Sequence, residues 1–397
     1  MNHPLPRGWQ KVRLGDICDI NVNSLKENTN KNYQFKYIDL SSVKNGIIDF
    51  PNNYITFKNA PSRAKRIIKI DDVIMATVRP NLKGFAYISF DPKEYICSTG
   101  FAVLTSKSEI CMKYIYQILY ANYIEKQISN MLVGSNYPAL NTSDILNIKI
   151  LLPPIDEQKR IADILSTFDD LIENLNKLIE KKEIYKKGVM QRVLTGEVRF
   201  NGFKDEWETM RIGDICEYKN GNSFENYIDE NGKLFLITLD SITIDGRLKN
   251  NHKKINIDTK ELLSKNDIVM ILSDIAHGYF LGLTAVIDKD NCYVLNQRVA
   301  LLKPNNIIVN SYFLSKLINI NQKYFKKYGQ GSSQQNLQKK SVENFIVKIP
   351  SLEEQNKIAE LLTLIDKDIE ILKQILQLRK LQKKGVMQKL LTGEVRI

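Results

Sequence analysis

Residues 186–200 read KKGVMQRVLTGEVRF, and residues 383–397 read KKGVMQKLLTGEVRI. The two stretches differ at three positions only: Arg192/Lys389, Val193/Leu390 and Phe200/Ile397. Their offset is 385 − 188 = 197 residues, about half of the 397-residue chain. A repeat of this period is too long for a solenoid unit and indicates duplicated domains. The sequence therefore predicts a fold that is built twice.

The likeness between the two halves is uneven along the chain. It is clear near the start of each half, where residues 14–18 read LGDIC and residues 212–216 read IGDIC. It is clear again in the segment that leads into each of the two stretches above. In between, residues 19–130 and 217–327 share only short patches. We therefore expect two variable bodies, each set between similar flanking segments.

Composition favours a globular protein with a polyanionic partner. Lysine and arginine exceed aspartate and glutamate by 57 − 45 = 12, and 43% of residues are hydrophobic. A lysine-rich proteome gives the same charge balance, so charge favours nucleic acid without proving it. No apolar run reaches the roughly 18 residues of a membrane span, and the start resembles no secretory signal, so we expect a cytoplasmic protein. The five cysteines form no CxxC pair, and Cys18 and Cys216 are predicted to be small core residues.

Two heptad patterns predict two long helices. Each follows a proline, at Pro153-Pro154 or Pro350, and has acidic residues in its first turn. Apolar residues then alternate in steps of four and three: Ile161, Leu165, Phe168, Ile172, Leu175 and Ile179, and likewise Ile358, Leu362, Ile365, Ile369, Leu372 and Leu376. The first helix is expected from Pro154 to about Lys186. The two seams are predicted to form an intramolecular antiparallel pair; the alternative is that each seam packs on its own domain.

The variable bodies, which precede these helices in the sequence, have a different pattern of apolar and polar residues. Short alternating segments such as 35–40 and 72–78, and their counterparts 234–239 and 268–272, predict strands. Helical patches such as residues 112–119 lie between them. Each body is therefore predicted to be α+β.

Catalytic motifs are largely missing from the sequence. It contains neither a G-x-x-x-x-G-K-[ST] nor a G-x-G-x-x-G loop. The three histidines, His3, His252 and His277, have no counterparts in the other half, which excludes a histidine centre common to both copies. Glu157-Gln158 and Glu354-Gln355 do recur, but at first-turn positions where an acid offsets the helix dipole. We therefore predict no catalytic residue, no metal site and no cofactor in this chain.

Two polar loops occupy equivalent positions in the two halves of the sequence. Residues 134–141 read GSNYPALN and residues 331–337 read GSSQQNL. Asn and Gln pair bidentately with adenine and Ser serves either base edge, so these loops are suited to reading DNA; the alternative is an ordinary surface loop. Residues 79–83 and 296–298 add guanidinium and amide groups beside predicted strands.

The residues predicted to contact DNA are distributed over both halves. They are Arg79, Asn81, Lys83, Ser98, Thr99, Ser135, Asn136, Tyr137 and Asn141, and His277, Tyr279, Gln297, Arg298, Ser332, Ser333, Gln334, Gln335 and Asn336.

In combination these features resemble the specificity (S) subunit of Type I restriction-modification systems. The resemblance covers essentially the whole chain and rests on the start around Gly15-Asp16-Ile17, the proline and Glu-Gln that open each long helix, and the closing block from Gly188 to Gly196, all duplicated. Residues 98–101 and 296–299 are similar to segments of target recognition domains. The resemblance implies two pseudo-two-fold-related α+β target recognition domains separated by two long antiparallel, coiled-coil-like helices. Their expected bounds are 1–152 and 199–349 for the recognition domains, and 153–198 and 350–397 for the helical regions.

The resemblance also implies a division of labour. Each recognition domain would read one half of a bipartite, asymmetric site in double-stranded DNA, and the helices would dock two modification (methyltransferase) subunits and, through them, restriction subunits. S-adenosylmethionine and ATP would be held by those partners. Residues assigned to partner binding are Ile161, Leu165, Gly188, Met190, Ile358, Leu362, Gly385 and Met387.

The expected length of the long helices can be compared with the dimensions of DNA. About 30 helical residues span roughly 45 Å, comparable with one turn of DNA, so the helix pair would act as a ruler that sets the distance between the two half-sites.

One alternative function is a coiled-coil adaptor that joins two proteins without sequence-specific DNA contact. The other is an enzyme with a diverged nuclease or methyltransferase centre.

Overall fold

The computed structural model describes residues 5–132, 138–275, 280–331 and 334–397. The chain forms two compact units, which we describe separately. Unit 1 comprises residues 1–176 and 374–397, and unit 2 comprises residues 177–373. The division falls inside the two long helices, α5 (Ile155–Leu194) and α10 (Leu352–Leu390). Unit 1 is therefore assembled from both ends of the chain, whereas unit 2 is one continuous segment.

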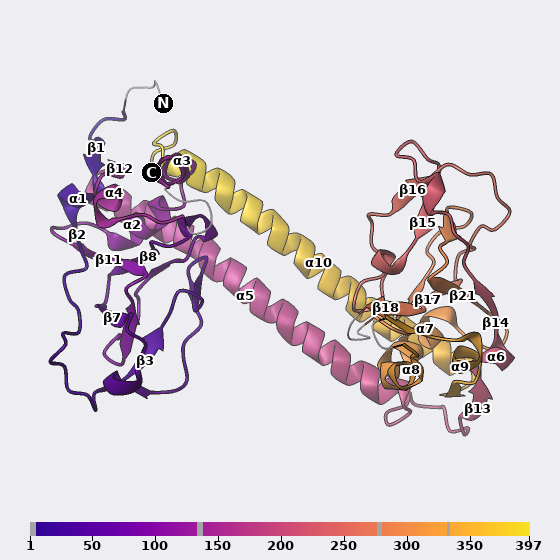
Figure 1. Ribbon diagram of the computed structural model, residues 1–397. Helices are drawn as coiled ribbons and strands as arrows, with labels where there is room; N and C mark the ends of the chain where they lie inside the picture. Colours follow the sequence, from indigo (N-terminus) through magenta and orange to yellow (C-terminus); the bar gives the residue numbers. More distant parts are fainter. Residues whose placement is uncertain (1–4, 133–137, 276–279, 332–333) are drawn as a thin grey trace. The chain divides into compact units, whose positions relative to one another are not determined.

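Unit 1 contains two four-stranded sheets (Figure 1). One has the order β2 (Cys18–Ile20), β11 (Phe101–Ser106), β8 (Val73–Ala76), β9 (Phe85–Tyr87), with every pair antiparallel. The other has the order β6 (Ile55–Thr56), β3 (Gln34–Ile38), β10 (Tyr95–Ser98), β7 (Ala64–Ile67), in which β3 and β10 are parallel. The remaining elements are β1 (Gln10–Arg13) paired with β12 (Lys149–Leu152), the hairpin of β4 (Val43–Lys44) and β5 (Ile47–Ile48), α1 (Leu14–Ile17), α2 (Met112–Ile118), α3 (Asn122–Met131), α4 (Thr142–Leu146), and the 3-10 turns η1 (Phe57–Asn59) and η2 (Pro80–Leu82).

Unit 2 repeats the central sheet of unit 1. Its strands β14 (Cys216–Asn220), β21 (Val299–Pro304), β17 (Ile268–Ile271) and β19 (Thr284–Val286) have the same order and the same antiparallel pairing as β2, β11, β8 and β9. The remaining elements are β13 (Glu208–Arg211) with β23 (Ile346–Ile349), the sheet of β16 (Lys253–Ile255), β15 (Leu234–Ile237) and β20 (Tyr293–Leu295), β18 (Ser273–Ile275) with β22 (Gln334–Asn336), α6 (Ile212–Ile215), α7 (Ser311–Ile320), α8 (Gln322–Tyr328), α9 (Lys339–Glu343), and the 3-10 turns η3 (Glu225–Tyr227) and η4 (Leu239–Ser241).

The sequence explains why these sheets form. Strand β8 reads VIMA and strand β17 reads IVMI, and all eight residues are buried. A short continuous apolar run of this kind is typical of a strand covered on both faces. Cys18 and Cys216 are buried free thiols, as predicted. The predicted α+β character of both bodies, and the presence of two long helices, are confirmed.

The long helices contribute to the cores in a way the sequence left open. Ile161 and Leu165 are fully buried in the core of unit 1, together with Leu390 and Leu391 from the end of the chain. Further along the seams, Ile179 and Ile369 are buried in unit 2. The first turns of each helix therefore pack on their own domain.

Ion pairs between the helices define their direction. In unit 2, Lys182 pairs with Asp368 at 2.8 Å and Lys186 pairs with Asp366. As the residue number rises along α5 it falls along α10, so the two helices run antiparallel, as predicted (Figure 1). Helix α5 is longer than expected, because it continues 194 − 186 = 8 residues past Lys186. Within the described part of the chain, no helix combines the length and the apolar character of a membrane span.

Candidate nucleic-acid interface

In unit 1 the buried strand β8 leads directly into a polar surface. Beyond Ala76 the chain bends at Thr77, and Val78 forms an antiparallel bridge with Ala139. The Arg79 N–H donates to the Pro138 carbonyl at 2.8 Å. The structure thus brings together two segments that the sequence nominated separately, residues 79–83 and the described end of the loop at 138–141.

Unit 2 repeats this arrangement. Beyond β17 the chain forms β18, which pairs antiparallel with β22. The register sets Ser273 opposite Asn336 and Asp274 opposite Gln335. The Leu337 N–H donates to the Leu272 carbonyl at 2.8 Å, just as the Leu140 N–H donates to the Thr77 carbonyl at 2.8 Å in unit 1.

A third segment joins the other two in each unit. The Thr77 N–H donates to the Gly100 carbonyl at 2.8 Å, and the Leu272 N–H donates to the Arg298 carbonyl at 3.0 Å. We call the joined segments platform 1, for residues 77–83, 98–100 and 138–141, and platform 2, for residues 272–275, 297–298 and 334–337. Both platforms share a backbone framework, although their side chains differ.

The basic turn of platform 1 has a constrained backbone. Arg79 and Lys83 have positive φ values of 50° and 55°, and Pro80–Leu82 forms a 3-10 turn between them. Left-handed conformations in residues other than glycine cost energy and persist where the surroundings impose them. Arg79 and Asn81 are exposed, whereas Lys83 is half-buried and pairs with Glu125 at 3.2 Å. The turn therefore presents its polar groups in a fixed arrangement.

Two predicted contact residues of unit 1 have structural roles instead. Ser98 is only 2% exposed, and its hydroxyl accepts a hydrogen bond from the Gly100 N–H at 3.1 Å. The prediction that Ser98 contacts DNA is therefore wrong for this conformation, because the side chain is buried. Asn141 is exposed, but its Oδ1 caps α4 by accepting from the Asp144 N–H at 3.0 Å. Thr99 is half-buried beside them.

Platform 2 carries mostly amides. Gln297 and Arg298 are exposed, and Gln334 and Gln335 are half-buried. Asn336 is exposed, and its Oδ1 accepts a hydrogen bond from the Ser273 hydroxyl. The other predicted contact residues lie outside the described residues: Ser135, Asn136, Tyr137, His277, Tyr279, Ser332 and Ser333.

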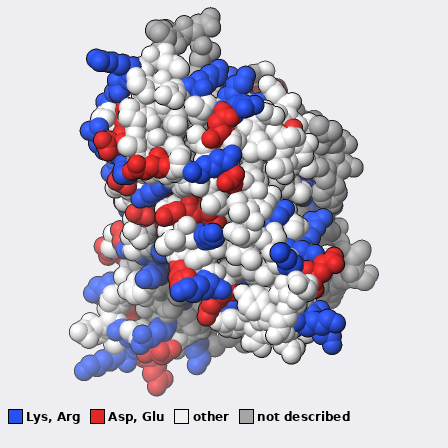
Figure 2. Space-filling view, turned by 90° about the vertical axis from the view of Figure 1, so that its left-hand side faces the viewer, with Lys and Arg blue, Asp and Glu red and all other residues white. Residues whose placement is uncertain are grey.

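The structure adds two residues that sequence reasoning missed. Arg63 is exposed, and its carbonyl accepts from the Thr99 N–H at 2.8 Å, which places it beside platform 1. Asp274 lies opposite Gln335 in platform 2. Neither belongs to a segment shared by the two halves, so the repeat gave no signal for them. On the face drawn in Figure 2, lysine and arginine side chains are interspersed with acidic ones.

Four residues assigned to partner binding are buried in the core. Ile161, Leu165, Ile358 and Leu362 are each at most 1% exposed. Their assignment as a docking surface is wrong for this fold, because each packs inside its own unit. Met387 is also buried, at 9% exposed, and Met190 is half-buried against the core of unit 2.

The duplicated glycines have a different environment. Gly188 and Gly385 lie within α5 and α10, and a Cβ on either would meet nothing within 4 Å. Four residues earlier, Ile184 and Leu381 are 62% and 66% exposed. Residues four apart share one helix face. We call these pairs the helix patches: Ile184 with Gly188 in unit 2, and Leu381 with Gly385 in unit 1.

The platforms carry polar groups of the kinds that can hydrogen-bond to base edges. Their described residues supply amide, hydroxyl, guanidinium, ammonium and carboxylate groups and include neither histidine nor cysteine. Burial raises the pKa of the Cys18 and Cys216 thiols to about 12, so neither forms a thiolate readily. Among the described residues, no group of three or more His, Cys, Asp or Glu is placed to hold a metal ion.

Comparisons with known proteins agree with this geometry. The family model for the Type I restriction modification DNA specificity domain matches the chain twice, at residues 6–183 and 204–379. The chain is 26% identical to the Type I restriction enzyme MjaVIII specificity subunit of Methanocaldococcus jannaschii, over 99% of this chain and 94% of that protein. It is 25% identical to the putative MjaX specificity subunit of the same organism, over 99% and 95%. Its fold is similar to that of the Type-I restriction-modification S subunit from M. genitalium, with a TM-score of 0.63, 16% identity, and 98% and 97% of the two chains covered.

Proposed function

The chain belongs to the Type I restriction-modification DNA specificity family, and on that basis we propose that it is the DNA-recognition subunit of such a complex. Each unit reads one half of a bipartite, asymmetric site in double-stranded DNA. The observation that carries this proposal is the pair of platforms, which keep one backbone framework while their side chains differ. A duplicated framework with divergent side chains is what two different half-sites require.

Affinity and discrimination have separate sources in this proposal. Lysine and arginine side chains, which outnumber aspartate and glutamate by 57 − 45 = 12, neutralise phosphates, which gives affinity that depends on salt and not on sequence. The platforms then read base edges. Gln334, Gln335 and Gln297 can form bidentate pairs with adenine, Arg79 and Arg298 with guanine, and Asp274 can accept from the cytosine amino group.

The helix patches are proposed to dock two copies of one methyltransferase partner. Exposed Ile184 and Leu381 occupy equivalent positions, since 381 − 184 = 197 is the repeat offset. Glycine in a helix interior costs about 1 kcal/mol relative to alanine. Among the residues that the structure describes, nothing fills the space at Gly188 or Gly385, so close approach by a partner is a reason for both glycines.

The partners supply the chemistry. In this proposal S-adenosylmethionine and ATP are bound by the methyltransferase and restriction subunits, and the target base is flipped into the methyltransferase. This chain contributes no catalytic residue. The adaptor alternative is not favoured, because it gives no role to the polar platforms that both units retain.

The two helices are proposed to set the distance between half-sites. Helix α5 has 40 residues and α10 has 39. At 1.5 Å per residue each is roughly 60 Å long, so a change of one heptad alters the length by roughly 10 Å.

The deciding experiment is a methylome comparison. We expect deletion of this gene to abolish every bipartite methylated motif attributable to the neighbouring methyltransferase, and re-expression to restore it. Replacement of residues 19–152 by those of a relative is expected to change one half of the motif only. Unchanged methylation after deletion would remove the proposal, and a change in both halves would contradict the assignment of one unit to each half-site.

A further inference from the structure

Unit 2 contains a cavity that is separate from platform 2. Its volume is about 610 Å³, within the range of small-molecule sites. Strands β15, β19 and β20, the loop at residues 246–252, helix α7 and residues of α10 line it, and it is open to solvent.

Helix α7 differs from its counterpart α2 at the residues that face or flank the cavity. The hydrogen bonds from the Cys111 N–H to Gln158 and from the Asn310 N–H to Gln355 align α2 with α7 at an offset of 310 − 111 = 199. At that offset Ser315 and Asn319 replace Tyr116 and Tyr120. In unit 1 the two tyrosine rings pack edge to face at 5.4 Å. In unit 2 the short Ser315 side chain lines the cavity, while Asn319 is hydrogen-bonded to the backbone of Thr284 at 2.8 and 2.9 Å.

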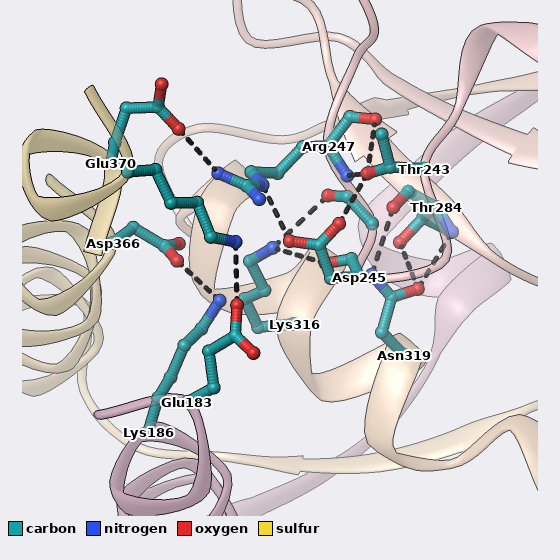
Figure 3. Close-up of polar contacts among 12 residues, drawn as sticks. Glu183, Lys186, Thr243, Asp245, Arg247, Thr284, Lys316, Asn319, Asp366 and Glu370 are labelled. Atoms are coloured by element: carbon teal, nitrogen blue, oxygen red, sulfur yellow. Dashed lines mark hydrogen bonds and ion pairs between the residues drawn. The ribbon is translucent and has the colours of Figure 1, made fainter. Parts of the chain in front are cut away.

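The floor of the cavity carries a buried cation. Lys316 is 2% exposed, and its Nζ donates to the carbonyls of Asp245 and Gly246 at 3.3 and 3.2 Å (Figure 3). Burial lowers the pKa of Lys316 to about 8. In unit 1 the equivalent residue is the neutral Gln117.

The carboxylates around Lys316 are already engaged. Asp366 accepts from Lys186, and Asp245 pairs with Arg247 at 2.6 Å (Figure 3). Asp366 also accepts from the Tyr312 hydroxyl. Within the described residues, no carboxylate lies within 4.0 Å of the Lys316 ammonium. A buried cation without a direct counter-charge is unfavourable, and an anion entering the cavity would relieve this cost.

One wall of the cavity is aromatic. The rings of Phe235, His252 and Tyr293 lie 5.6 to 6.0 Å from one another. The Nδ1 atom of His252 is buried and has no hydrogen-bond partner among the described residues. The Asp288 carboxylate accepts from the Tyr293 hydroxyl at 2.7 Å, which engages this acid as well. Such a wall favours a planar ring that carries a hydrogen-bonding group.

We propose that this cavity binds a small ligand that joins a planar heteroaromatic ring to an anionic group, the chemistry of a mononucleotide. The anionic group occupies the end of the cavity at Lys316, and the ring packs on the wall of Phe235 and Tyr293. The site is specific to unit 2, since unit 1 has Tyr116 and Gln117 at the corresponding positions. It goes beyond DNA recognition and does not depend on it.

Calorimetry on the purified full-length chain, without DNA or partner, tests this proposal. The probes are the four ribonucleoside 5′-monophosphates, with inorganic phosphate and the four nucleosides in parallel. We expect at least one monophosphate to bind saturably with 1:1 stoichiometry, and more tightly than its nucleoside or inorganic phosphate. No saturable binding at millimolar concentration overturns the proposal. Equal binding of inorganic phosphate overturns the role of the ring.

Two variants that introduce the residues of unit 1 locate the site. We expect Lys316→Gln and Ser315→Tyr each to weaken binding at least tenfold, while the matched control Lys340→Gln, at an exposed lysine of α9, leaves it unchanged. Lys316→Gln keeps a polar side chain, so it provides the test if Ser315→Tyr does not fold. Unchanged affinity in Lys316→Gln places the ligand elsewhere and overturns the proposal. Displacement of the ligand by a DNA duplex of unrelated sequence would assign the cavity to backbone phosphate and equally overturn it.

Discussion

The guanidinium of Arg396 forms a bidentate contact with the carboxylate of Glu157, at 2.8 and 3.2 Å, although 239 residues separate them. Arg199 makes the same contact with Glu354, at 2.7 and 3.0 Å. Each arginine is the penultimate residue of one of the two repeated stretches, 186–200 and 383–397, and each glutamate lies in the first turn of a long helix. The closing block at the end of the chain thus completes unit 1, while the one in mid-chain completes unit 2. These buried glutamates are anchors of the fold as well as first-turn acids.

Loss of either arginine is expected to destabilise its unit, but not equally. Glu354 is fully buried and Glu157 is 3% exposed, so each variant leaves an unpaired buried carboxylate. Glu157 keeps a hydrogen bond from Trp9 Nε1 at 3.1 Å, whereas the equivalent atom of Trp207 has no partner among the described residues. We expect Arg199→Ala to lower the free energy of unfolding by about 2 to 4 kcal/mol and Arg396→Ala by less. Urea titrations measure both, with Arg192→Ala as the exposed control; equal losses would contradict the role given to Trp9.

Single substitutions in the platforms are expected to relax one half-site each. Gln335→Ala in platform 2 removes one amide, which should reduce discrimination at one base by about 1 to 3 kcal/mol. Asn81→Ala in platform 1 should act on the other half-site. Methylome sequencing of each variant, with Lys340→Gln as a control, gives the result. Relaxation of both half-sites by one variant would be inconsistent with separate platforms.

The helix patches are expected to control partner stoichiometry. Ile184→Asp and Leu381→Asp each place a charge where a partner is proposed to dock, and should weaken one of two docking events by about 10- to 100-fold. Native mass spectrometry should then show one methyltransferase copy per chain instead of two, and none in the double variant. Ile307→Asp is the control, because Ile307 is 85% exposed and lies outside the long helices. Retention of two copies in the double variant argues against these patches.

Lengthening both helices together is expected to change the spacing of the methylated motif. One heptad inserted after Asn176 in α5 and one after Lys373 in α10 keeps the antiparallel seams in register. The added length is roughly 10 Å, or about three base pairs at 3.4 Å each. Methylome sequencing should therefore find the same half-sites about three base pairs further apart. If the number of base pairs between the half-sites does not change, the helices do not set that spacing. The comparison variant carries one extra heptad in α5 alone, which disrupts the pairing of the two helices.

The free energy of unfolding should depend on pH in a way that reveals the lowered pKa of Lys316. Its pKa is lowered from 10.5 to about 8, first by burial and then by the charge of Lys186. Below pH 8 both folded and unfolded states carry the charge. As pH rises from about 8 towards 10.5 the folded state loses the proton first, so the free energy of unfolding rises.

A Lys316→Gln variant isolates this contribution. Relative to it, the unmodified chain should gain about 1 to 3 kcal/mol between pH 8 and pH 10, measured by urea titration at each pH. Asp245, Asp366 and Arg247 remain in both proteins, so their titration cancels in the difference. Parallel pH profiles for the two proteins would show that Lys316 keeps its ordinary pKa.

The sequence showed which segments form the platforms better than it showed which of their side chains are exposed. The loops at 79–83 and 334–336 were predicted to contact DNA because their residue types suit base edges. Residue type can be read from the local sequence alone. Ser98 has a suitable side chain too, yet it is buried at the end of β10. Whether the remaining nominated residues contact DNA stays a prediction.

The partner-binding assignment shows the same limit. A heptad pattern identifies an apolar seam but does not say what covers it. Ile161 and Leu165 have the periodicity of a docking stripe and are core residues, whereas Ile184 and Leu381, outside the seam, are exposed. Only packing distinguishes the two groups.

The sequence alone determined that the fold is built twice, that each half is α+β with a long helix, and that the flanks stayed alike while the bodies diverged. These properties follow from residue identity and periodicity, which are local. Tertiary structure decided which closing block completes which unit, which segments meet in a platform, and where Lys316 lacks a counter-charge. Those relationships join residues up to 239 positions apart, and they depend on packing and burial, which no local pattern encodes.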